Sequence, residues 1–215
     1  MIVTIDGPAG SGKSTVARLL ADRLSVRFLD TGAMYRAVAF AVLRSPVSET
    51  DSDGVAEVAD AVDLQFQDDI LHLNGVDVSN EIRTAEVTAI SSVVAANPAV
   101  RERLVELQRQ VGRQGSLVTE GRDQGSVVFT DAEYKFFLTA TMDARARRRH
   151  RELVGGGSKL TLSTVRTQLS QRDARDENRT HAPMKPAEDA VIIDTSAMSI
   201  AQVVDALAER VSPTA

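Results

Sequence analysis

The chain opens with the apolar run IVTI (residues 2–5), and the segment GPAGSGKS (residues 7–14) follows one residue later. A short run rich in β-branched residues is typical of a buried strand. After Lys13, apolar residues recur up to Leu24 at the spacing of one helix face. Residues 7–14 match the pattern G-x-x-x-x-G-K-[ST]. Strand, glycine turn and helix together are the context in which this pattern forms a phosphate-binding loop.

The residue types in this loop suit a nucleoside triphosphate. Glycines let backbone N–H groups point inward around a phosphate, and the start of a helix adds a partial positive charge. Lys13 can reach the β- and γ-phosphates, and the Ser14 hydroxyl can hold Mg²⁺. The loop alone does not specify the reaction. We expect the nucleotide to be bound by Gly7, Pro8, Ala9, Gly10, Ser11, Gly12, Lys13, Ser14 and Thr15.

Strand-like and helix-like segments alternate along most of the remaining chain. Apolar runs predict four further strands, at residues 26–30, 117–119, 134–138 and 191–194. The predicted helices are 32–43 (capped by Thr31), 54–61, 86–96, 98–112, one capped by Asp143, 161–175 and 200–211. This alternation predicts an α/β fold: a five-stranded parallel sheet of the P-loop NTPase type, flanked by helices.

Two segments depart from this alternation. Residues 64–67, 70–73 and 76–78 alternate in polarity, with turns at Asp68-Asp69 and Asn74-Gly75, and an Asn-Gly pair between such runs indicates a hairpin. We therefore expect a small antiparallel β insertion at residues 63–88. The glycines at 155–157 predict a mobile linker in a short lid, residues 150–160. We treat residues 1–215 as a single domain that includes both segments.

Composition narrows the class of protein. The formal net charge is −5, which argues against a general binder of nucleic acid or membranes. The chain contains no cysteine, so disulfides and cysteine-ligated metals are excluded. The first residues resemble a strand rather than a signal peptide, and no apolar run approaches the ~20 residues that span a bilayer. We expect a soluble, cytoplasmic monomer without nucleic-acid or membrane partners.

Arginines form a second group of candidate site residues. Arg145, Arg148 and Arg149 share one helix face, and Arg172, Asp176 and Arg179 share another beyond the glycine linker. Two such faces joined by a hinge indicate a lid that closes over phosphates, where planar arginine donors stabilise the transferred group.

None of the three histidines is a credible general base, because His72 lies in a hairpin, His150 among arginines and His181 in a polar loop. A hydroxyl acceptor would need a base, whereas a phosphate monoester is already largely ionised at neutral pH. Many arginines without a base therefore favour a phosphate acceptor.

Several motifs resemble the bacterial cytidylate kinase family, a family of P-loop nucleoside monophosphate kinases. They are residues 4–8 (TIDGP), 29–36 (LDTGAMYR), 80–84 (NEIRT), 121–125 (GRDQG), 172–176 (RDARD) with Asn178-Arg179, and 191–195 (VIIDT). They occur from end to end of the chain in the order of the family, and the hairpin insertion falls where the family enlarges its nucleotide-monophosphate-binding region. The resemblance implies ATP-dependent phosphorylation of CMP and dCMP to CDP and dCDP, with Mg²⁺.

The resemblance also implies roles for individual residues. The predicted catalytic set is Lys13, Arg122, Arg148, Arg149 and Arg179. CMP would be held by Thr31 and Tyr35 lining its pocket, by Arg36, Arg122 and Arg179 at its phosphate, by Arg172 and Asp176 at its ribose, and by Ser92, Arg101 and Asp123 at cytosine. Ser91 could replace Ser92 by a shift of one residue. Glu120 departs from the family, which usually has Asp before Gly-Arg-Asp.

Other functions stay open at this point. A small-metabolite kinase of the shikimate or gluconate type would use the same loop, but it gives no reason for the hairpin insertion. A nucleotide-binding switch protein that recognises guanine would carry a motif such as Asn-Lys-x-Asp, which is absent from the sequence. An inactive binding module would not need Lys13, Ser14 and the complete arginine set.

Overall fold

The computed structural model describes residues 1–67 and 70–211. They form two compact units. The core unit comprises residues 1–28 and the described residues from 116 onward, and the insert unit comprises residues 29–115. The predicted insertion at 63–88 is therefore part of a larger unit, and a single domain over residues 1–215 stays a prediction. The predicted turn at Asp68-Asp69 lies outside the described residues.

The parallel sheet has the strand order β2-β6-β1-β7-β8. β1 pairs in parallel with β6 and β7 on its two sides, with Ile5 opposite Glu120 and Phe136, and β7 pairs in parallel with β8. This confirms the predicted five-stranded parallel sheet. The strand bounds are β1 Ile2–Asp6, β2 Arg27–Asp30, β6 Leu117–Gly121, β7 Tyr134–Thr139 and β8 Val191–Asp194.

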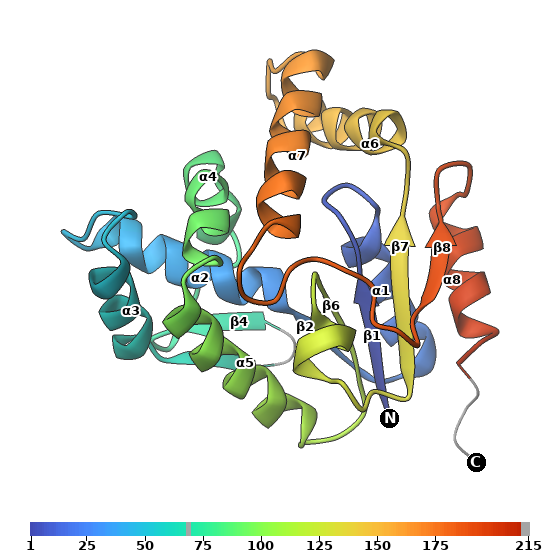
Figure 1. Cartoon of the computed structure of the whole chain (residues 1–215), viewed down its shortest axis with the longest axis horizontal. Helices are drawn as coiled ribbons and strands as arrows, with labels where there is room; N and C mark the ends of the chain where they lie inside the picture. Colours follow the sequence, from blue (N-terminus) through green and yellow to red (C-terminus); the bar gives the residue numbers. More distant parts are fainter. Residues whose placement is uncertain (68–69, 212–215) are drawn as a thin grey trace. The chain divides into compact units, whose positions relative to one another are not determined.

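Strand alternation in β1 separates an apolar face from a polar one. Val3 and Ile5 join the apolar cluster formed with α1 (Lys13–Leu24) and α8 (Ile200–Ala208), two helices that contact each other. Thr4 and Asp6 alternate with them and so face the opposite side. Beyond the carboxyl end of β7 the chain continues into α6 (Met142–Gly155) and then α7 (Leu162–Glu177) (Figure 1). The helix α6 therefore begins at the sheet edge that carries the glycine loop.

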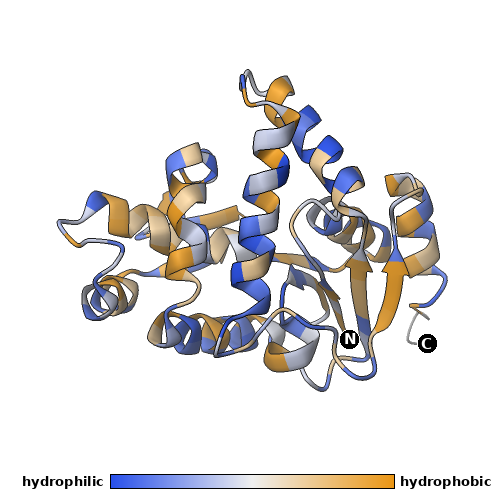
Figure 2. Ribbon diagram, turned by 45° about the horizontal axis from the view of Figure 1, so that its top comes forward, coloured by the Kyte–Doolittle hydropathy of each residue, from blue (hydrophilic) through white to orange (hydrophobic). Residues whose placement is uncertain are grey.

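The helix α7 has an unusual buried side. Figure 2 shows the strands of the parallel sheet mostly in the hydrophobic colour, whereas α7 is mostly hydrophilic along its length. Its buried residues are Val165, Leu169, Asp173 and Asp176. An amphipathic helix normally buries an apolar stripe. Two carboxylates on the buried side mean that α7 is held by charge as well as by apolar packing.

The insert unit is built around α2 (Thr31–Arg44), which contacts α3, α4, α5 and the 3₁₀ turn η1. Its three-stranded antiparallel sheet has the order β3-β4-β5, which confirms the predicted insertion. Asn74 and Gly75 join β4 to β5 with φ values of 51° and 78°, as a two-residue hairpin turn requires. The other bounds are α3 Ser52–Ala61, β3 Leu64–Gln67, β4 Ile70–Leu73, β5 Val76–Asp77, η1 Glu81–Arg83, α4 Ala85–Val94 and α5 Pro98–Gly112. No helix among residues 1–67 and 70–211 is long and apolar enough to cross a membrane.

Two predicted helix caps are wrong. The cap of α2 is Asp30 rather than Thr31, because β2 runs into the helix without a loop and the Asp30 carboxylate accepts a hydrogen bond from the backbone N–H of Ala33 (2.8 Å). The cap of α6 is Thr141, whose hydroxyl accepts from the backbone N–H of Ala144, and Asp143 lies in the first turn. Both aspartate and threonine are good caps, so composition does not separate them.

The close approach of the loop to β7 gives a test of the fold. Gly7 has a φ of +146°, and a Cβ added there would lie 2.1 Å from the carbonyl oxygen of Leu138. We expect Gly7→Ala to lower the free energy of unfolding by about 1–3 kcal/mol, the usual cost of overpacking, as measured by urea denaturation.

Gly155 provides the matched control for this change. An added Cβ there meets nothing within 4 Å, and no unusual φ is required. We expect Gly155→Ala to leave stability unchanged or to raise it by up to about 1 kcal/mol. Equal stabilities of the Gly7→Ala protein and the parent would contradict the tight contact with β7.

Candidate functional site

The loop between β1 and α1 has the geometry of a phosphate-binding loop. Gly7, Gly10 and Gly12 adopt positive φ values of 146°, 76° and 91°. The backbone N–H of Ser11 donates to the carbonyl of Pro8 (3.4 Å) and closes the turn. The Ser11 hydroxyl is buried and makes no hydrogen bond within the described part of the chain. A buried hydroxyl in this position fits a ligand oxygen such as that of a phosphate.

Lys13 lies folded back over this loop. Its ammonium donates to the carbonyl of Pro8 (3.3 Å) and is 3.8 Å from the carboxylate of Glu120, and both charged side chains are about 6% exposed. Burial lowers the pKa of Lys13 and the nearby Arg122 guanidinium lowers it further, whereas Glu120 acts in the opposite direction. The phosphates of a nucleotide would supply the additional negative charge that favours the charged ammonium.

A buried carboxylate on α7 binds two of the predicted arginines of the core unit. Asp176 accepts hydrogen bonds from Arg122 Nε (2.8 Å) and from the guanidinium of Arg179, which lies two residues beyond the end of α7. Burial raises the pKa of Asp176, but the charges of Arg122, Arg179 and Arg172 outweigh it and hold the pKa below its usual value. Four predicted site residues thus belong to one charged cluster, here called the Asp176 cluster: Arg122, Arg172, Asp176 and Arg179.

The arginines of α6 separate into different environments. Arg148 donates to the Thr195 hydroxyl (3.0 Å) and to the carbonyl of Ser11 (3.3 Å), so it contacts the phosphate loop. Arg149 pairs with Glu152 (3.1 Å) on the exposed side of the same helix. Arg145, predicted to face phosphates together with these two, pairs instead with the buried Asp173. The three arginines share a helix face in the sequence pattern, but each has different partners in the structure.

Asp123 is buried in the turn that follows β6. This turn continues into a single turn of π-helix, η2 (Gln124–Val128). The carboxylate of Asp6, at the end of β1, accepts hydrogen bonds from the backbone N–H groups of Gln124 (2.9 Å) and Gly125 (2.8 Å). The strand that leads into the phosphate loop therefore also holds the turn that carries Arg122 and Asp123.

In the insert unit, two arginines converge on the cap of α2. Asp30 lies 3.2 Å from Arg36 Nη2 and 3.5 Å from Arg83 Nη2. Arg36 is a predicted site residue, but sequence reasoning assigned no role to Asp30 or Arg83. Asp30 could have been found as a carboxylate at a strand end. Arg83 lies in the motif at residues 80–84, but its approach to Asp30, 53 residues earlier in the chain, had no local signal.

Among the remaining predicted residues of the insert unit, the structure brings Arg101 and Tyr35 together. The guanidinium of Arg101 lies 5.8 Å from the ring centre of Tyr35. Thr31 is buried at the start of α2, and Ser92 is buried on α4. The alternative residue Ser91 donates its hydroxyl to the carbonyl of Thr88 in the same helix.

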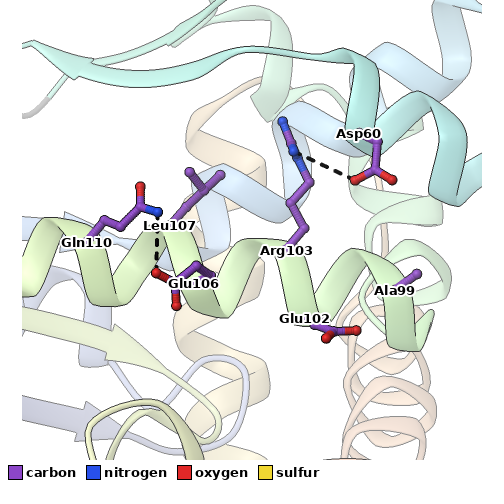
Figure 3. Close-up of a pocket in the computed structure, with 7 residues that line it drawn as sticks. All are labelled: Asp60, Ala99, Glu102, Arg103, Glu106, Leu107 and Gln110. Carbon is purple, nitrogen blue, oxygen red and sulfur yellow. Dashed lines mark hydrogen bonds and ion pairs between the residues drawn. The ribbon is translucent and has the colours of Figure 1, made fainter.

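A shallow pocket on α5 contains none of the predicted site residues. Figure 3 shows Arg103 reaching toward Asp60 of α3 (3.7 Å) and Gln110 donating to Glu106 (3.3 Å). Three carboxylates, including Glu102, line this pocket and would repel phosphate groups. No group of three or more metal-ligating side chains was found among the residues that the structure describes.

The glycine loop lies at the carboxyl ends of the parallel strands and contains a buried lysine, and an arginine–carboxylate cluster lies beside it. These features define the class of P-loop phosphotransferases. Comparisons with known proteins identify the family. The family model for cytidylate kinase matches residues 3–213. A cytidylate kinase of Geobacter sp. (strain M21) is 47% identical over 214 residues, which are 98% of this chain and 91% of the relative. That of Clostridioides difficile (strain 630) is 41% identical over 212 residues, or 99% and 98% of the two chains.

The fold recurs at low sequence identity. A crystal structure of an uncharacterized protein from Eubacterium ventriosum matches with a TM-score of 0.54 at 14% identity, covering 98% of this chain and 97% of that one. This likeness concerns the fold, whereas the family model and the curated relatives concern the sequence. The chain belongs to the cytidylate kinase family.

The environment of Asp6 gives stability a specific pH dependence. Burial raises the pKa of Asp6 from 3.8 to about 7, and the nearby Asp123 and Glu120 add to the increase, although its two backbone hydrogen bonds oppose it. At a pH between 3.8 and about 7, Asp6 holds a proton in the folded protein and has released it in the unfolded chain. The contribution of this group to stability is therefore fully present below pH 3.8 and is lost as the pH rises through about 7.

Asp6→Asn removes this titration. We expect the free energy of unfolding of the parent to fall, relative to that of Asp6→Asn, as the pH is raised from 4 to 8. Urea denaturation across this range measures the difference. Asp22→Asn, which changes an exposed carboxylate on α1, should run parallel to the parent. A constant difference between the parent and Asp6→Asn would show that Asp6 does not titrate in this range.

Proposed function

We propose that this protein transfers the γ-phosphoryl group of ATP to CMP and dCMP, giving ADP and the nucleoside diphosphates. The observation that carries the proposal is the membership of the chain in the cytidylate kinase family, whose model matches residues 3–213. The buried Lys13 in a phosphate loop and the Asp176 cluster provide the chemical parts that such a transfer needs.

The reaction depends on positioning and charge more than on proton transfer. The transferred group carries negative charge on its oxygens, and lysine and arginine donors stabilise that charge where water is excluded. We assign this role to Lys13, Arg122, Arg148, Arg149 and Arg179. The acceptor phosphate is largely ionised at neutral pH, so no side chain has to remove a proton.

Mg²⁺ belongs to the proposal through the nucleotide. Ser14 is exposed in the first turn of α1, directly after Lys13, and its hydroxyl is a hard oxygen ligand of the kind Mg²⁺ accepts. Because no cluster of side chains was found to bind a metal among residues 1–67 and 70–211, the ion would be held mostly by phosphates and water. When bound, it neutralises charge on the phosphates.

We assign recognition of the acceptor to the residues that the sequence predicts for it. Arg172 and Asp176 bind the ribose, and Arg36, Arg122 and Arg179 bind the phosphate. Thr31 and Tyr35 line the pocket, and Ser92, Arg101 and Asp123 bind cytosine. The buried carboxylate of Asp123 suits the exocyclic amine of cytosine, while arginine suits the ring acceptors N3 and O2.

We further propose a cytoplasmic monomer that acts on small molecules, without a nucleic-acid or membrane partner. The net charge of −5 supports this part of the proposal. A coupled assay with ATP and a panel of acceptors tests the function: CMP, dCMP, UMP, AMP, GMP, shikimate and gluconate. Phosphorylation of the sugar acids alone, or slow ATP hydrolysis that no acceptor stimulates, would favour the alternative kinase or the switch protein.

Lys13 provides a direct test of the phosphate loop. Because its ammonium accompanies the transferred group, we expect Lys13→Ala to lower kcat at saturating ATP by several powers of ten, each about 1.4 kcal/mol of transition-state stabilisation. The circular dichroism spectrum should be that of the parent. Arg210→Ala removes an exposed positive charge near the end of α8 and should leave kcat unchanged. Turnover of Lys13→Ala within about tenfold of the parent would exclude the loop from the mechanism.

Asp123 provides a test of base recognition. UMP would present a carbonyl oxygen to this buried carboxylate, and an unpaired buried polar group costs about 1–3 kcal/mol. We expect the parent to prefer CMP to UMP by more than about tenfold in kcat/KM. Asp123→Asn supplies a donor that uracil can use, so the preference should shrink, mostly through loss of CMP activity.

The control for Asp123→Asn is Asp131→Asn, an exposed position in the connection from η2 to β7. Four values of kcat/KM, from parent and Asp123→Asn with CMP and UMP, decide the result. An Asp123→Asn enzyme as selective as its parent would show that another residue distinguishes the two bases.

A further inference from the structure

Ala9, in the middle of the phosphate loop, is held by two helices that follow it by more than 130 residues. Its carbonyl accepts a hydrogen bond from Arg145 Nη1 (3.1 Å), and its backbone N–H donates to Asp173 Oδ1 (3.4 Å). Arg145 and Asp173 also pair directly with each other. Both polar groups of Ala9 are thus bound by the two members of one buried ion pair.

The surroundings reinforce this contact. The side chain of Ala9 packs in an apolar cluster with Ala146 of α6 and with Val165 and Leu169 of α7. A Cβ added at Gly10 would lie 3.1 Å from the carbonyl oxygen of Arg145. The loop and the start of α6 are therefore in backbone contact, and the ion pair lies within that contact.

We propose that Arg145 and Asp173 are positioning residues that clamp the phosphate loop to α6 and α7 and thereby set the affinity for the donor nucleotide. Burial of an ion pair is not in itself stabilising, because the loss of hydration can exceed the attraction. Stability of the fold is therefore a weak explanation for this pair. A better explanation is that the backbone carbonyl and N–H of Ala9 lack partners in helix or sheet hydrogen bonding and are bound by these two side chains. In naming ATP as the donor, the inference rests on the proposed function.

The clamp also fixes the position, relative to the loop, of the arginines that are assigned to the transferred phosphoryl group. Arg148 follows Arg145 by three residues on α6 and contacts the carbonyl of Ser11. Asp176 follows Asp173 by three residues on α7 and gathers Arg122 and Arg179. Because each pair lies on one side of its helix, a displacement of the clamp would move these arginines relative to the phosphates.

A second ion pair between the same helices provides a matched control. Arg166 of α7 donates to Asp143 of α6 (2.7 Å), and the two side chains are 59% and 62% exposed. This pair links α6 to α7 at the surface, without the buried contact to Ala9. Removal of this surface pair therefore tests the link between α6 and α7 alone, without a change in the contacts that hold the phosphate loop.

The experiment compares three proteins in addition to the parent. Asp173→Asn removes one charge from the clamp. A double variant, Arg145→Met with Asp173→Leu, removes the pair without leaving a buried charge, so it is expected to fold even where Asp173→Asn does not. The control is the double variant Asp143→Ala with Arg166→Ala. For each protein the KM for ATP, the KM for CMP, kcat and the Kd for ADP by titration calorimetry are measured.

We expect the KM for ATP and the Kd for ADP to rise by about tenfold or more in both clamp variants, as loss of a buried charge-assisted hydrogen bond predicts. The KM for CMP should change much less, because Arg122 and Arg179 keep their contacts with Asp176 in both variants. The surface control should match the parent in all four values. A merely structural pair would instead lower the active fraction, and with it the apparent kcat, at unchanged KM and Kd. An apolar double variant that binds ADP as the parent does would overturn the proposal.

The design separates this inference from the proposed function. Absence of CMP phosphorylation by the parent would refute the proposed function. The Kd for ADP in the parent and its variants would still decide whether the clamp sets nucleotide affinity, because that measurement does not involve an acceptor.

Discussion

A phosphate-binding loop must keep its shape without the hydrogen bonds of a helix or a sheet, and the rest of the core unit depends on how this constraint is met. Gly7 lies directly against β7, and Ala9 is bound by the buried ion pair of α6 and α7. The carbonyl of Ser11 accepts hydrogen bonds from Arg148 and from the Thr195 hydroxyl (3.2 Å). Successive parts of the loop are thus held by elements that lie far apart in the chain.

The site imposes a second requirement, which concerns the charge of its buried side chains. Stabilising a transferred phosphoryl group requires cations in a site from which water is excluded, and such cations are costly to bury alone. The core unit offsets this cost with carboxylates: Glu120 lies beside Lys13, and Asp176 binds Arg122 and Arg179. The Glu120 carboxylate lies 3.8 Å from the Lys13 ammonium.

The sequence predicted those features that depend on local pattern. The glycine loop, the five strands and the Asn74-Gly75 hairpin follow from periodicity and turn chemistry over a few residues, and the structure confirms them. Helix periodicity could not separate Arg145 from Arg148, because the partner that distinguishes them, Asp173, lies 28 residues away. The convergence of Arg83 on Asp30 was missed for the same reason. The role of each charged residue depends on tertiary contacts, and these have no periodic signal in the sequence.

The arrangement of α7 shows how one short motif serves two purposes. In the segment RDARD (residues 172–176), Asp173 and Asp176 lie three residues apart and so on one side of the helix, and both are buried. One carboxylate binds the arginine that holds the phosphate loop, and the other binds the arginines of the Asp176 cluster. A helix turn is rigid over this distance, so α7 sets the spacing between the two carboxylates. The hydrogen bonds of Asp6 to Gln124 and Gly125 additionally tie the turn that carries Arg122 to β1. The double use of the motif explains why a largely hydrophilic helix buries two carboxylates on the side that contacts the rest of the core unit.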